Sequence, residues 1–298
     1  MALTKEEQLI RLEGCAKIRN IAAQTCLLVF QHTLNSPNKV SELNFRNRWG
    51  MEFEKAYFRG FVGCWYEPPP GGVGVLFGSD KHTDRINYPT LRDKDYRPKL
   101  KIYFDKSSYG YLFASPYTFI NDVPVIGDWG LTYYLGNDEK IKDHYRKCYQ
   151  LQNILIDFIK MGTKFSEIYG KVIKELKLNN LENKVYSTRD EALMNIGHTV
   201  PFIDRDPEGE EKEAISSGDG KLLNKAISGA RIFINKDSGY EITENCAFTF
   251  EPRLTSLEDP SLPQWSFHTI VQFVEGKKIV LSNFNGVINL LGMDWMTQ

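Results

Sequence analysis

Ala-Phe-Thr-Phe-Glu-Pro-Arg, residues 247–253, is the stretch of this sequence that decides the fold. In it Phe248 and Phe250 alternate with Thr249 and Glu251, which is the period-two pattern of a β-strand with one apolar face. Burying an unpaired charge is costly, so a carboxylate in such an apolar run needs a partner. We therefore expect Glu251 to belong to a buried polar site.

The strand is followed by a predicted hairpin, in which His268–Val274 and Lys278–Ser282 pair across residues 275–277. Upstream, amphipathic patterns predict a helix from the capping box at 4–7 toward residue 37, a second from about 141 to 162, and a third over 165–176. Helices that come first and in the middle, with strands interleaved and late, favour an α+β fold. Residues 206–222 are acidic and rich in Gly and Ser, so we expect a mobile surface loop there, with a lid as the alternative.

Length and composition limit the number of domains and the classes of partner. The 298 residues, 42% hydrophobic, are enough for one large domain or two modest ones. We expect a single domain over 1–298, whose N-terminal half, 1–109, holds a polar insertion at about 78–110, and whose second half, 110–298, carries the motifs. The net charge of -1 disfavours a nucleic-acid surface, and no apolar run approaches the roughly 18 residues of a membrane span. The N-terminus is polar and the five cysteines form no C-x-x-C pair, which favours a cytoplasmic protein with reduced thiols.

Three short phrases, far apart in the sequence, each hold one side chain suited to a metal ion. Asp128 stands in Gly-Asp-Trp-Gly-Leu-Thr, residues 127–132; His198 stands in Gly-His-Thr-Val-Pro, residues 197–201; Glu251 is the third. Two carboxylates and an imidazole can bind a divalent ion and leave other positions open for a substrate. We expect one divalent ion at these three residues. Two negative ligands favour iron or manganese, with zinc left open.

The order of these phrases resembles the pita-bread metallopeptidase family, which includes methionine aminopeptidase, prolidase, aminopeptidase P and creatinase. The resemblance covers about residues 110–285 and implies a curved antiparallel sheet covered by helices. The family binds two metal ions with two Asp, one His and two Glu. Asp128 matches the second Asp, His198 the metal histidine, and Glu251 the Glu of the family's Thr-x-Glu-Pro phrase.

Two of the five family ligands are absent from the sequence. Counting back from Asp128 to the place of the first Asp gives Ser-Pro-Tyr, residues 115–117, and the place of the last Glu holds Phe267. Both missing ligands belong mainly to one of the two ions. An alternative register makes Asp128 the first Asp, with Asp138 or Glu139 as the second, but it leaves too little chain before the helix near residue 141.

A site with one ion lacks the bridged hydroxide of a two-metal hydrolase. The resemblance therefore implies a mononuclear metal-dependent enzyme that is not a peptidase and cleaves a small amino-acid-like substrate by hydrolysis or elimination. The alternatives are a non-haem iron enzyme that uses oxygen, and a metal-free pseudo-enzyme that serves as a binding module. A homodimer is permitted. The predicted catalytic residues are His268, Tyr117 and Arg205. The predicted substrate-binding residues are Arg253, Tyr133, Phe267 and Thr269.

Overall fold

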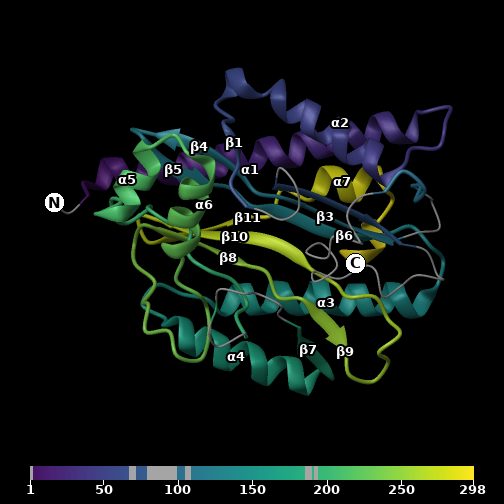
Figure 1. The fold of residues 1–298 in the computed structure, drawn as a ribbon. Helices are drawn as coiled ribbons and strands as arrows, with labels where there is room; N and C mark the ends of the chain where they lie inside the picture. The colour runs from purple at the N-terminus through teal and green to yellow at the C-terminus, as the bar shows by residue number, and fades with distance from the viewer. Residues whose placement is uncertain (1–2, 67–71, 79–98, 105–108, 185–189, 191–193) are drawn as a thin grey trace.

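The computed structural model describes residues 3–66, 72–78, 99–104, 109–184, 190 and 194–298 (Figure 1). Its centre is a six-stranded sheet in the order β11-β10-β6-β3-β2, with β8 pairing β10, and every pair in it is antiparallel. The strands are β2 (Val73–Phe77), β3 (Tyr109–Ala114), β6 (Trp129–Tyr134), β8 (Cys246–Phe250), β10 (Phe267–Val274) and β11 (Lys277–Leu281).

Helices lie on both sides of this sheet (Figure 1). On one side are α1 (Lys5–Leu34), α2 (Glu42–Glu54) and α7 (Asn285–Leu290), and on the other are α3 (Glu139–Phe158) and α4 (Phe165–Leu178). The predicted capping box opens α1, because the Thr4 hydroxyl accepts from the Glu7 amide and the Glu7 carboxylate accepts from the Thr4 amide. The α+β class and the three helices predicted from periodicity are thus confirmed.

Smaller elements surround the central sheet. A three-stranded sheet joins β1 (Gly63–Cys64), β4 (Pro116–Ile120) and β5 (Val123–Ile126), and β7 (Leu181–Asn183) pairs with β9 (Leu254–Ser256). Two 3-10 helices are also described, η1 (Tyr57–Arg59) and η6 (Asp294–Met296). None of the described helices is long and apolar enough to span a membrane. The predicted polar insertion at 78–110 lies mostly outside the described residues.

The prediction of a loop over 206–222 was wrong. This segment forms α5 (Glu210–Ser216) and the start of α6 (Gly220–Gly229). Asp219 caps α6, since its carboxylate accepts from the amides of Lys221 and Leu222. Leu223 and Ile227 then recur four residues apart and are buried. The acidic, Gly-rich composition of residues 206–222 favoured a loop, because the buried apolar residues at helical spacing, Leu223 and Ile227, come only after this segment.

Candidate functional site

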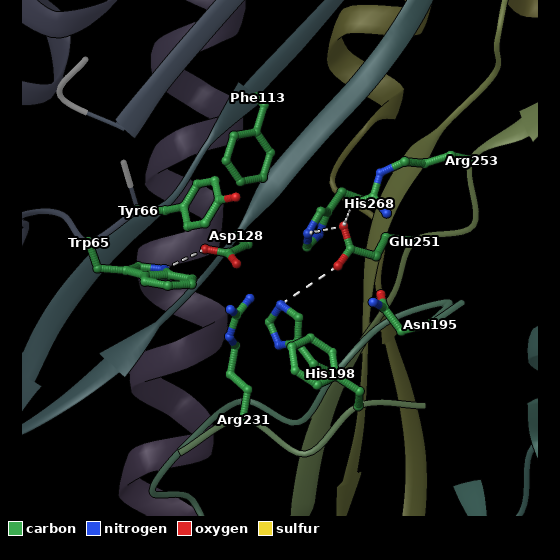
Figure 2. A pocket seen from close by; sticks show the side chains of 11 residues that line it. Trp65, Tyr66, Phe113, Asp128, Asn195, His198, Arg231, Glu251, Arg253 and His268 are labelled. Atoms are coloured by element: carbon green, nitrogen blue, oxygen red, sulfur yellow. Dashed lines mark hydrogen bonds and ion pairs between the residues drawn. The ribbon is translucent and has the colours of Figure 1, made fainter. Parts of the chain in front are cut away.

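One small pocket gathers side chains from distant parts of the chain (Figure 2). It holds two carboxylates, Asp128 and Glu251, together with the basic side chains His198, His268, Arg231 and Arg253. Its remaining walls are Asn195 and the aromatic rings of Trp65, Tyr66, Phe113 and Phe233. Five of the ten residues predicted from the sequence therefore meet here: Asp128, His198, Glu251, His268 and Arg253.

Gly130 in β6 brings two of these rings together. It pairs with Phe113 of β3 on one side and with His268 of β10 on the other, and the two rings meet with their centroids 5.6 Å apart. A Cβ atom at Gly130 would lie 2.7 Å from the Leu112 carbonyl oxygen, closer than any side chain can approach. The glycine two residues after Asp128 is thus required by strand packing.

His198 is held by a segment that lies against β8. Gly197 has a φ of +151°, and a Cβ there would lie 2.0 Å from the Thr249 carbonyl oxygen, so only glycine fits. The His198 amide donates to the Thr249 hydroxyl at 2.9 Å, and the Thr249 amide donates to the His198 carbonyl at 2.7 Å. Backbone contacts therefore hold His198 against β8, the strand that directly precedes Glu251.

Glu251 is the most heavily paired side chain in the pocket. Its Oε2 accepts from His268 Nε2 at 2.9 Å and from Arg253 Nη2 at 2.9 Å. Its Oε1 lies 3.6 Å from His198 Nε2 and accepts from the Thr249 hydroxyl at 3.4 Å. Burial alone would raise the pKa of this carboxyl, but the charges of His268 and Arg253 hold it well below its usual range. Glu251 is therefore an ionised, internally neutralised carboxylate.

Asp128 has fewer partners than Glu251. It is 1% exposed, and its Oδ1 accepts from Trp65 Nε1 at 2.8 Å. Burial raises its pKa to about 6, against smaller lowering effects of the His268 charge and the Trp65 hydrogen bond. Trp65 is the side-chain donor that the structure gives to this carboxylate among the described residues, and it bonds to Oδ1. Asp128 thus offers the pocket a carboxylate acceptor.

His198 is neutral. Its Nδ1 lies 2.9 Å from the Thr199 carbonyl oxygen, and since a carbonyl only accepts, Nδ1 carries the proton and Nε2 presents a lone pair. Burial lowers the pKa of this ring to about 3, with a further lowering by the charge of Arg231. The lone pair of Nε2 faces Glu251 in the pocket (Figure 2).

Arg231 was not predicted from the sequence. Its guanidinium carbon lies 5.2 Å from the centroid of the Trp65 ring and 5.1 Å from that of Phe233, and its Nε donates to the Ser228 carbonyl at 3.3 Å. Figure 2 shows the guanidinium group pointing toward Asp128 beside the His198 ring. No motif marks this arginine. The only signal is the alternation of Arg231 and Phe233 with two isoleucines, which puts both on one face of an extended segment.

The side chains as arranged do not fit a metal ion. Among the residues described, no group of three or more His, Cys, Asp or Glu is placed to hold one. Oε2 of Glu251 is already bonded to two donors, and two guanidinium groups stand in the same pocket as the two carboxylates. A divalent ion about 4 Å from one guanidinium would be repelled by roughly 8 kcal/mol at an effective dielectric constant of about 20. The predicted metal site remains a prediction that this arrangement does not support.

The other five predicted residues lie outside the pocket lining, and the roles predicted for them stay predictions. Strand alternation explains three: Phe267 and Thr269 flank His268 and point to the opposite face of β10, and Tyr133 points away on β6. Phe267 stacks on Trp265, Thr269 accepts from Gln152 at 2.9 Å, and the Tyr133 ring packs 5.6 Å from that of Phe30.

Tyr117 and Arg205 lie elsewhere for other reasons. Tyr117 belongs to the separate β1-β4-β5 sheet and packs on Phe119. Arg205 is exposed and forms a bidentate ion pair with Glu211, with bonds of 2.6 and 2.7 Å. The catalytic roles predicted for these two are therefore not supported.

The position expected for the first Asp lies in a hairpin. The β4–β5 hairpin lies between β3 and β6, so counting back from Asp128 lands in this hairpin. Ser115, at its start, is buried and donates its hydroxyl to the Gly72 carbonyl at 3.3 Å. The residue that faces the pocket from β3 is Phe113. An aromatic ring, with no carboxylate, closes that side of the site.

Comparisons with known proteins agree with this architecture. No family model and no curated protein matches the sequence. Among solved structures, X-Pro aminopeptidase from Thermotoga maritima matches at a TM-score of 0.59 and 11% identity, over 95% of this chain and 62% of that one. Prolidase from Pyrococcus furiosus matches at 0.57 and 14%, over 94% and 65%. The N-terminal domain of FACT complex subunit SPT16 from chickpea matches at 0.58 and 11%, over 94% and 58%.

The chain spans about six tenths of the length of these structures, since the covered shares are 62%, 65% and 58%. At such low identity the likeness is one of fold. The curved antiparallel sheet between two helical layers, predicted from the order of the motifs, is confirmed by the match. The chain therefore has the pita-bread fold of the prolidases and X-Pro aminopeptidases, as a divergent example of it.

Proposed function

We propose that this protein binds a small amino-acid-like molecule in its pita-bread pocket, and that it does so without a metal ion. The observation that carries the proposal is the positive charge that the chain places beside the two carboxylates. Glu251 is neutralised by Arg253 and His268, and Asp128 shares its pocket with Arg231. The charges are thus balanced by side chains of the chain itself.

The chemistry of the ligand follows from what the pocket presents. Asp128 presents a carboxylate beside aromatic rings, among them Trp65 and Tyr66, which suits an amino group. Arg231 carries a planar guanidinium group, whose shape and charge match a carboxylate. The free space among these side chains is about 20 Å³, enough for about one water molecule. A larger ligand would therefore insert only its charged end, or move side chains as it enters.

Thermal unfolding with a panel of amino acids and dipeptides, each measured with and without a chelator, tests the proposal. A compound at about 100 times its Kd should stabilise the fold by about 2.7 kcal/mol. We expect stabilisation that survives the chelator and is lost in Asp128→Asn. Asp143→Asn, on the exposed surface of α3, is the matched control and should respond as the unmodified protein does. If no compound stabilises the protein, or if the chelator abolishes the effect, the proposal is wrong.

A second candidate is the mononuclear metalloenzyme, whether hydrolytic, eliminative or oxygen-dependent. One observation favours it: His198 Nε2 and His268 Nε2 lie 3.6 and 2.9 Å from the two oxygens of Glu251. Ligands that share one ion through bonds of about 2.0–2.2 Å have comparable separations, roughly 3.3 Å in a tetrahedral site. This function would require Glu251 to release at least one of its present donors. The unfolding measurement with the chelator distinguishes the two candidates, because only a metal-dependent function should lose its ligand stabilisation there.

A further inference from the structure

We infer that Arg231 takes the place of a metal ion in this pocket and is the side chain that keeps such an ion out. This inference rests on the proposed metal-independent function and adds a specific cause to it. The cause is the fixed positive charge of Arg231, which adds to that of Arg253 and is contributed by a segment that no sequence motif marks.

The position of Arg231 is built by its surroundings. The guanidinium lies between two aromatic rings, with its carbon 5.2 Å from the Trp65 centroid and 5.1 Å from the Phe233 centroid. Its Nε is tied to the Ser228 carbonyl in the last turn of α6. The side chain of Asn224 on the same helix donates to the Trp65 carbonyl. Helix, indole and guanidinium are therefore linked, so the charge is placed by the fold and is not a mobile surface group.

The charge of Arg231 acts on the groups that an ion would bind. It faces Asp128 and His198 in the pocket (Figure 2), and it lowers the pKa of both. A bound cation would act on these side chains in the same direction. Because a second cation in the same small space would be repelled, the guanidinium and a divalent ion exclude one another.

Without the guanidinium, the remaining side chains can form a ligand set once Glu251 Oε2 releases the donor that His268 now gives it. His198 Nε2 already presents a lone pair, because its Nδ1 donates to the Thr199 carbonyl. Glu251 Oε1 lies 3.6 Å from that nitrogen, and His268 Nε2 and Asp128 line the same pocket. Two imidazoles and two carboxylates are ligands that Co²⁺, Zn²⁺, Mn²⁺ and Fe²⁺ accept. Removal of one positive side chain should therefore create a metal site.

The variant Arg231→Met tests this inference, because methionine keeps a long apolar stem between the two rings and removes the charge. Arg231→Lys is the matched control, since it keeps the charge. Co²⁺ alone is the probe, followed by its visible absorption and by metal content after desalting. We expect Arg231→Met to bind about one Co²⁺ per chain, at least about tenfold more tightly than the unmodified protein and Arg231→Lys. Adding His198→Ala to Arg231→Met should abolish the binding.

The possible results distinguish a failure of this inference from a failure of the proposed function. If Arg231→Met is folded and gains no Co²⁺, or if Arg231→Lys gains as much as Arg231→Met, the inference is overturned while the metal-independent function stands. If the unmodified protein already holds one ion per chain, both are overturned. If Arg231→Met does not fold, the same measurements are made on Arg231→Gln, which also lacks the charge and remains polar. The same outcomes then support or overturn the inference.

Discussion

The buried carboxyl of Asp128 should make the protein less stable at neutral pH than it would be with an amide in its place. Burial raises the pKa of Asp128 from 3.8 to about 6. The difference is about 2 units, and each unit corresponds to about 1.36 kcal/mol, so keeping this group ionised in the fold costs about 3 kcal/mol. Asparagine cannot ionise, and its amide oxygen can still accept the hydrogen bond from Trp65.

The pH dependence follows from the direction of the shift. Below about pH 4 the carboxyl is protonated in both states and costs nothing. Between about pH 4 and pH 6 the folded state binds more protons than the unfolded state, so the contribution of Asp128 to stability falls as the pH rises. Above about pH 6 the loss is complete and constant. Asp128→Asn should therefore match the unmodified protein at pH 4 and exceed it by about 3 kcal/mol at pH 8.

Urea unfolding at a series of pH values, with a chelator present, measures this difference. Asp143→Asn, a carboxylate on the exposed surface of α3, serves as control and should change stability by less than about 0.5 kcal/mol. If Asp128→Asn is less stable than the unmodified protein at pH 8, the reasoning is refuted. That result would mean that a cation stabilises the ionised carboxylate more than its burial destabilises it.

Three further predictions concern the frame of the pocket. Arg19 is fully buried and donates to three backbone carbonyls, two of them in pocket residues. Arg19→Met should therefore lower the free energy of unfolding in urea by about 3 kcal/mol or more. A loss no larger than that of Arg48→Met, an exposed control, would contradict this prediction. The pKa of His198 is about 3, so its ring signals in NMR should not move between about pH 5 and pH 8, and a titration near pH 6.5 would show that the ring is not buried as described. Gly197→Ala places a Cβ 2.0 Å from a carbonyl oxygen and should cost more than about 2 kcal/mol, whereas Gly170→Ala, in open space on α4, should be neutral or stabilising; equal effects would refute the backbone argument.

Side chains that depend on local backbone requirements could be predicted from the sequence. Asp128 and His198 stand beside glycines that the packing demands, Gly130 and Gly197, and Glu251 ends a strand whose alternation is plain. Short motifs of this kind can be found in a sequence because each sets its own backbone.

Side chains whose role depends on tertiary structure could not be found in the same way. Arg231 reaches the pocket only because α6 packs beside Trp65, and no spacing in the sequence expresses that contact. Phe113 was missed because a hairpin separates its strand from Asp128. The place of Phe267 and Thr269 outside the pocket lining was predictable, because neighbours of His268 on a strand cannot share its face.

Metal content tests the central claim most directly. The unmodified protein is incubated with Mn²⁺, Zn²⁺ and, without oxygen, Fe²⁺, then desalted and analysed for metal. A pocket that already holds two guanidinium groups, Arg231 and Arg253, beside its carboxylates should retain less than about a tenth of an ion per chain, and His198→Ala should not change that figure. About one ion per chain, lost in His198→Ala, would show that the pocket is a metal centre and that the account is wrong.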